Sequence, residues 1–110
     1  MNAQHPRLLI EVFPDLTDEL RERLRSEDEF ELASTLDELR IIDRCRCGDD
    51  FCGTFYTAPK PRLGYGPNHR TVDLDAEEGM LIVDAVDERI VCVEVLYRKH
   101  VRDRLAELLP

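Results

Sequence analysis

Three of the four cysteines of this 110-residue chain lie within eight residues, in the segment Cys45-Arg46-Cys47-Gly48-Asp49-Asp50-Phe51-Cys52. Gly48-Asp49-Asp50 has the composition of a tight turn, so the flanking residues are expected to form antiparallel strands. With Asp49-Asp50 as a two-residue turn, Cys47 would lie opposite Cys52. Cys45 would then lie on the same face, about 6.6 Å along the strand. The pattern therefore predicts three sulfur atoms on one side of a hairpin.

Converging thiolates at this spacing are candidate zinc ligands. Structural zinc takes four ligands in a tetrahedron, with Zn–S distances of about 2.3 Å, and its ligands typically occur as Cys-x₂-Cys pairs. The Cys-x-Cys-x₄-Cys spacing departs from that pattern and leaves the fourth ligand to a distant part of the chain. The candidate ligands are Cys45, Cys47, Cys52 and Cys92, with His69 or His5 as alternatives to Cys92.

Two other interpretations of the cysteines remain open. Opposed residues on antiparallel strands have Cα atoms about 4.5–5.5 Å apart, which is within the range of a disulfide, so Cys47 and Cys52 are a candidate redox pair. Cysteine is also among the most buried residue types and packs as a small apolar side chain. On that interpretation the three thiols continue the buried face of Leu39 and Ile41, beneath the helices.

Two N-terminal helices precede the cysteines. Leu16, Leu20 and Leu24 recur every four residues and predict a helix over residues 15–25, capped by Asp15. A capping-box pattern at Ser26 and Glu29 predicts a second helix from residue 26. The residues expected on its buried side are Phe30, Ala33 and Leu36.

The rest of the chain alternates with the period of strands and then ends in a helix. Strands are expected over residues 39–47, 51–57, 71–75, 80–86 and 89–97, and a closing helix over 99–109. Val91, Val93, Val95 and Tyr97 share the face expected to be core. The order predicts one α+β domain, residues 1–110, with an antiparallel sheet of four or five strands. Both N-terminal helices and the C-terminal helix would pack on one face, and an exposed edge strand would allow a homodimer.

Residues 58–70 contain three prolines and two glycines and show no periodicity, so they predict a long loop. Loops of this length in compact domains are often functional. This one carries Arg62 and His69 and is locally basic. Tyr65 lies between two glycines, and tyrosine is enriched at protein interfaces. Arg62, Tyr65 and His69 are therefore candidate partner contacts.

The formal net charge is −9, and residues 15–40 hold ten acidic but only four basic residues. An acidic field repels a phosphate backbone and attracts a basic protein, so nucleic acid is not an expected partner. The candidate contacts on the helices are Glu19, Glu22 and Asp28. No apolar run approaches a membrane span, and the N-terminus lacks the features of a signal peptide. A cytoplasmic location with reduced thiols and no membrane partner is expected.

No residues predict catalysis, because the sequence contains no Gly-x-Ser-x-Gly, phosphate-binding glycine loop or His-Glu-x-x-His. The Cys45–Cys52 stretch together with Phe55-Tyr56-Thr57 resembles small bacterial proteins of unknown function. The segment 79–97 is similar to a hairpin of another uncharacterised bacterial family, at Gly79, Ile90, Glu94 and Leu96. Neither resemblance implies an activity, a cofactor or a site residue.

The expected function is therefore non-catalytic protein binding without a cofactor, of an accessory or toxin-neutralising type, with a basic protein as partner. The first alternative is a zinc-binding domain built on Cys45, Cys47 and Cys52. The second is a thiol redox protein using the same segment.

Overall fold

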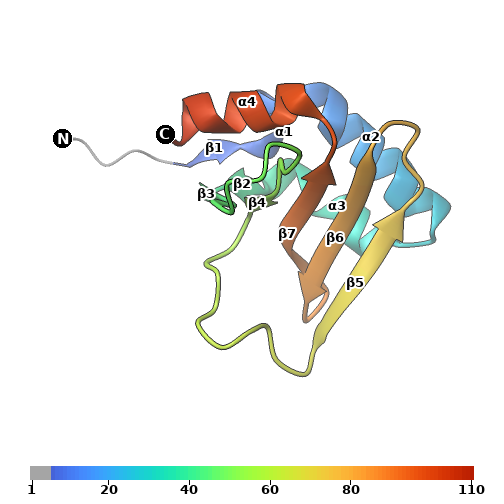
Figure 1. Cartoon of the computed structure of the whole chain (residues 1–110). Coiled ribbons are helices and arrows are strands. Elements are labelled where there is room, and N and C mark those ends of the chain that lie inside the picture. Colours follow the sequence, from blue (N-terminus) through green and yellow to red (C-terminus); the bar gives the residue numbers. More distant parts are fainter. Residues whose placement is uncertain (1–5) are drawn as a thin grey trace.

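The structure, a computed structural model, describes residues 6–110; His5 lies outside them. The large sheet is antiparallel and has five strands in the order β3-β4-β7-β6-β5, and β1 and β2 form a separate pair (Figure 1). The strands are β1 Arg7–Leu8, β2 Arg40–Ile41, β3 Asp43–Arg44, β4 Phe55–Tyr56, β5 His69–Leu74, β6 Met80–Val86 and β7 Arg89–Leu96. The helices are α1 Leu9–Val12, α2 Pro14–Ser26, α3 Phe30–Ser34, the 3-10 helix η1 Leu36–Glu38 and α4 Lys99–Leu108. The α+β prediction is confirmed.

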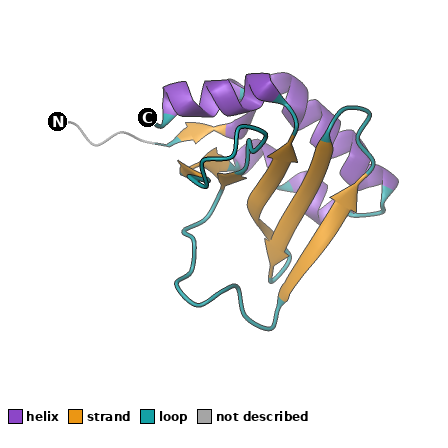
Figure 2. Cartoon of the chain, in the orientation of Figure 1, coloured by secondary structure: helices purple, strands orange, loops and turns teal. Residues whose placement is uncertain are grey.

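The helices cover one face of the large sheet, and the core lies between the two layers (Figure 2). Alternate residues of β6 and β7, such as Val83, Val93 and Val95, point into this core and are fully buried. The helices contribute the predicted leucine stripe of α2 and, from α4, Val101 and Leu105. The opposite face of the sheet carries the polar residues of the same strands. Asp84 and Cys92 are buried on that opposite face as well, and the apolar residues that alternate with them are the ones that face the helices.

The helix ends differ from the predicted ones. Helix α2 begins with Pro14 at its first position and Phe13 as N-cap, so Asp15 is not the cap. Ser26 ends α2 and donates from its hydroxyl to the carbonyl of Glu22, so the predicted capping box does not form. The chain turns at Asp28, which has a φ of +60°, and α3 starts at Phe30. Phe30 is 60% exposed and therefore does not join the core as expected.

The first predicted hairpin has the expected register but shorter strands: Asp43 pairs with Tyr56 and Arg44 with Phe55, the register that puts Cys47 opposite Cys52. The strand expected over residues 39–47 is limited to β2 and β3, and the returning strand is limited to β4. On its other edge the returning segment pairs with the end of β7: Gly53 donates to the carbonyl of Val95 at 2.7 Å, and Tyr97 donates to that of Phe51 at 2.8 Å. Regular β3–β4 pairing stops at Arg44 and Phe55, so Cys45 and Cys47 lie in the irregular segment beyond the strands.

The second predicted hairpin is correct, with one shift of register. Strands β6 and β7 pair along their length around a turn at Asp87 and Glu88, and β5 adds to β6 from His69 onward. The pairing shifts at Asp84/Ala85, where Ala85 pairs with Ile90 and Asp84 with Cys92, so Val91 is bulged out. Ile90 therefore takes the core position expected for Val91, and Tyr97, expected in the core, is 60% exposed.

Candidate metal centre

The segment from Cys45 to Cys52 is held between the sheet and helix α4. Cys45 donates its backbone N–H to the carbonyl of Thr54 at 2.9 Å. On the α4 side, Arg44 Nε donates to the carbonyl of Leu109 at 2.6 Å, and Arg46 donates to that of Pro110 at 3.2 Å. A Cβ at Gly53 would lie 3.2 Å from the backbone nitrogen of Arg102, so only glycine lets the segment approach α4 without displacing it. The segment is irregular, but it is anchored at both ends.

The sulfur atoms of Cys45, Cys47 and Cys52 all lie within 4.8 Å of one another. The predicted convergence is therefore correct, and the β3–β4 pairing that produces it has the predicted register although its strands end before the cysteines. In a tetrahedral zinc site with Zn–S of about 2.3 Å, neighbouring sulfurs are about 3.8 Å apart. The cluster needs to contract by roughly 1 Å to reach that geometry, a shift that side-chain torsions can supply.

The packing interpretation of the three thiols is wrong. Cys47 is exposed, and Cys45 and Cys52 are only partly buried. All three side chains are free thiols. Solvent, a metal ion or an oxidant can therefore reach the cluster.

Hydrogen bonds in the cluster lower the pKa of Cys52 and raise that of Cys47. Burial raises the pKa of Cys52, but hydrogen bonds from the hydroxyl and backbone of Thr54, and from the Cys47 and Cys45 thiols, outweigh it and lower the pKa overall. For Cys47, the backbone of Asp49 acts to lower the pKa, yet the Cys45 thiol, desolvation and the Cys52 thiol raise it to about 11. A cation that binds here would displace the proton of Cys47, which is the linkage expected of a thiolate metal site.

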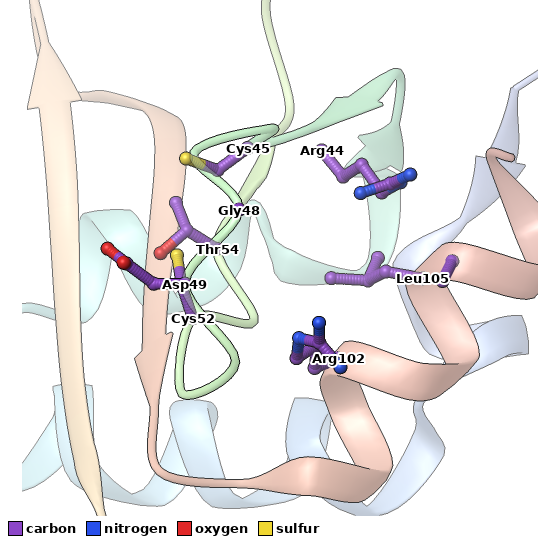
Figure 3. Close-up of a pocket in the computed structure, with 9 residues that line it drawn as sticks. Arg44, Cys45, Gly48, Asp49, Cys52, Thr54, Arg102 and Leu105 are labelled. Atoms are coloured by element: carbon purple, nitrogen blue, oxygen red, sulfur yellow. The ribbon is translucent and has the colours of Figure 1, made fainter.

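A small cavity of about 150 Å³ adjoins the cluster (Figure 3). In the close-up, the sulfurs of Cys45 and Cys52 lie on the same side as the Asp49 carboxylate and the Thr54 hydroxyl. Arg44, Arg102 and Leu105 lie on the other side. The residues that line it are Arg44, Cys45, Gly48, Asp49, Cys52, Thr54, Arg102, Leu105 and Ala106.

Cys92 does not join the other cysteines. It is buried on β7, where its cross-strand partners are Asp84 and Tyr56. Burial and the carboxylates of Asp84 and Glu94 raise its pKa above the usual range for a thiol. Cys92 lies on the sheet face opposite the helices and is buried there among Asp84, Glu94 and Tyr65. The prediction that Cys92 completes a four-cysteine site has no support in this geometry.

Comparison with known protein families, with curated proteins and with solved structures finds no match for this chain. Among the helices of residues 6–110, none is long and apolar enough to cross a lipid bilayer.

His69 and Tyr65 lie on the sheet face opposite the helices, not with the thiols. His69, expected in the loop, begins β5, and its Nε2 lies 2.9 Å from Asp84 Oδ1. The ring of Tyr65 is tilted against the ring of His69, with their centroids 4.7 Å apart. Glu94 lies close by, and burial together with the Asp84 and Asp73 carboxylates raises its pKa to about 7. Sequence reasoning missed Asp84 and Glu94, although acidic residues inside valine-rich strands are a visible signal.

The remaining candidate partner contacts differ in whether their side chains are exposed or already engaged within the fold. Glu19 accepts two hydrogen bonds from Arg98, at 2.7 and 2.8 Å, and the Arg98 side chain is only 6% exposed. The hydrogen bond from Arg98 lowers the pKa of Glu19, so this carboxylate already serves the fold. Glu22, Asp28 and Arg62 are exposed. Of the three acidic candidates, Glu22 and Asp28 are therefore the exposed ones.

Proposed function

We propose that this protein binds one thiophilic metal ion, zinc in the first place, through Cys45, Cys47 and Cys52. The observation that supports the proposal is the mutual distance of the three sulfur atoms, all within 4.8 Å. Soft thiolate ligands select zinc, Cu(I) and similar ions over the hard cations, which prefer carboxylate and carbonyl oxygens.

The charge of the surroundings favours a divalent ion. Three thiolates and Zn²⁺ carry a net charge of −1, whereas three thiolates and Cu(I) carry −2. Arg44 and Arg46 flank Cys45 in the sequence, and Arg102 borders the adjoining cavity. These three arginines offset the charge of −1 of the zinc form more completely than the charge of −2 of the Cu(I) form.

The bound metal would have a structural or metal-holding role and not a hydrolytic one. Zinc activates water best when neutral histidines leave it strongly positive, and three thiolates donate most of that charge back. A metal at this position would cross-link the irregular segment 45–52, which is itself tied to α4 and β7. Binding is therefore expected to stabilise the fold as well as the loop.

Zinc titration of the reduced, metal-free protein tests this proposal. We expect one equivalent to bind in competition with a chromophoric chelator. We also expect the melting temperature to rise with zinc, because a free metal concentration 100 times the Kd adds about 2.7 kcal/mol of stability. The absence of binding, with a melting temperature that neither zinc nor a chelator changes, would contradict it. An intact mass that shows a disulfide in place of bound metal would favour the thiol redox alternative, which the lowered pKa of Cys52 also supports.

Protein binding is a second candidate function, supported by one further observation. Phe51 and Tyr97 are 38% and 60% exposed and stack on each other with ring centroids 5.2 Å apart. Exposed aromatic side chains are frequent anchors of protein interfaces. The acidic surface at Glu22 and Asp28 would attract a basic partner.

Charge reversal distinguishes this second candidate. Glu22→Arg and Asp28→Arg are expected to slow association with a basic protein partner, in a way that high salt masks, because rim charges act mainly on the association rate. Glu19→Arg is unsuitable as a variant, since it would leave Arg98 buried without its partner. Association rates equal to those of the wild type in low salt would count against an acidic recognition surface.

A further inference from the structure

We propose that the carboxylate of Asp49 completes the metal site as its fourth ligand, giving a coordination of three sulfurs and one oxygen. This inference rests on the metal-binding function proposed above. It assigns a residue that the cysteine pattern does not identify, because the sequence offers Cys92 and two histidines for the same position.

The main chain of Asp49 is already fixed against the cluster on both sides. The backbone of Asp49 hydrogen-bonds to the thiol of Cys47. Its carbonyl accepts a bond from the backbone N–H of Cys52 at 3.3 Å. Hydrogen bonds from the backbone to thiolates stabilise the charged form of the ligand and orient it. Asp49 therefore occupies the turn around which the cysteines gather.

The side chain of Asp49 is exposed and lies on the same side as the sulfurs. Asp49 lines the same cavity as Cys45 and Cys52, and its carboxylate lies outside the group of atoms within 4.8 Å of one another. Within residues 6–110, the ion pairs include none with Asp49. An aspartate has two side-chain torsions, so rotation alone can move the oxygen toward the roughly 2.0–2.2 Å that zinc requires.

The other candidate ligands are engaged elsewhere. Asp43 Oδ1 accepts bonds from the backbone of Arg44 at 2.8 Å and from the Arg46 guanidinium at 3.2 Å. His69 is paired with Asp84 on the far face of the sheet, and Cys92 is buried beside it. A carboxylate brings the charge of an occupied site to −2, and Arg44 and Arg102 border the same cavity to offset it.

Neighbouring alanine variants give a matched test. Asp49→Ala should weaken zinc binding roughly 10–100-fold, the loss usual for groups that support a metal site. Asp50→Ala removes an equal charge from the adjacent, exposed position of the same turn and should keep the wild-type affinity. Asp49→Asn keeps the size of the side chain and its backbone bonds, and it should show a loss similar to that of Asp49→Ala.

Cobalt substitution provides a second measurement. Co²⁺ in the wild-type protein should give the absorption of a tetrahedral site with three sulfur ligands, and Asp49→Cys should increase the sulfur-to-cobalt charge-transfer absorption and tighten binding. If the wild-type protein binds no metal, both proposals fail. If it binds zinc and Asp49→Ala binds as tightly as Asp50→Ala, only the assignment of Asp49 is overturned.

Discussion

Replacing Cys52 with serine should lower the zinc affinity of this protein by more than roughly 100-fold, because even changes outside the ligand shell cost 10–100-fold. Cys52 is the thiol whose pKa is lowered, by the hydroxyl and backbone of Thr54 and by the two other thiols, against the effect of burial. It therefore ionises more readily than Cys47, whose pKa is raised, and is the expected first ligand of the metal. Serine has nearly the same size but ionises far less readily and is a poor ligand for soft ions. Competition with a chromophoric chelator measures the change.

Cys92→Ala is the control for this prediction. Cys92 is also a thiol, but it lies on β7 among Asp84, Glu94 and Tyr65 and outside the sulfur cluster. The variant should keep the zinc affinity of the wild type, although the loss of a buried side chain will lower its stability. Equal losses of affinity in Cys52→Ser and Cys92→Ala would show that the cluster does not bind the metal.

Gly79→Ala should destabilise the fold by about 3 kcal/mol or more, the largest single-site effect on stability that we predict. A Cβ at this position would lie 2.2 Å from the carbonyl oxygen of Leu96. That oxygen belongs to the backbone of β7, so no side-chain rotation relieves the clash, and the end of the strand must move. Gly79 also has a φ of +67°, a conformation that costs a residue with a Cβ about 1–2 kcal/mol by itself. Urea denaturation with an unchanged m-value measures the loss.

Gly64→Ala separates the two contributions. Gly64 has a φ of +89°, but nothing lies within 4 Å of the position of its Cβ. The destabilisation of this variant therefore comes only from the backbone conformation and should be about 1 kcal/mol. If the two alanine variants lose the same stability, close approach to Leu96 is not what requires glycine at position 79.

The elements that the sequence predicts well are those whose determinants are local. The leucine repeat of α2 and the turn of the β6–β7 hairpin each lie within a few residues of the structure that they specify. The same holds for the thiol cluster, because a turn between Cys47 and Cys52 brings their sulfurs together whether or not strands flank it.

The features that the sequence does not predict depend on distant partners. Residues 51–53 also pair with β7, about 40 residues later, and no local pattern predicts this second contact. The pairing of His69 with Asp84, and of Glu19 with Arg98, is equally remote in sequence. The bulge at Val91 moves Ile90 into the core, and a strict alternation cannot anticipate an inserted residue. The sequence predicts Asp49 only as a turn residue, because its neighbours in space are known only once the segment is folded.

The sheet face opposite the helices has a consequence for how this molecule responds to its solvent. Burial and the carboxylates of Asp84 and Asp73 raise the pKa of Glu94 to about 7, so this carboxyl group takes up a proton near neutrality. Small changes of pH around neutrality therefore change the protonation of Glu94. The protein is thus a weak proton buffer in the very range in which most carboxylic acids have long been fully dissociated.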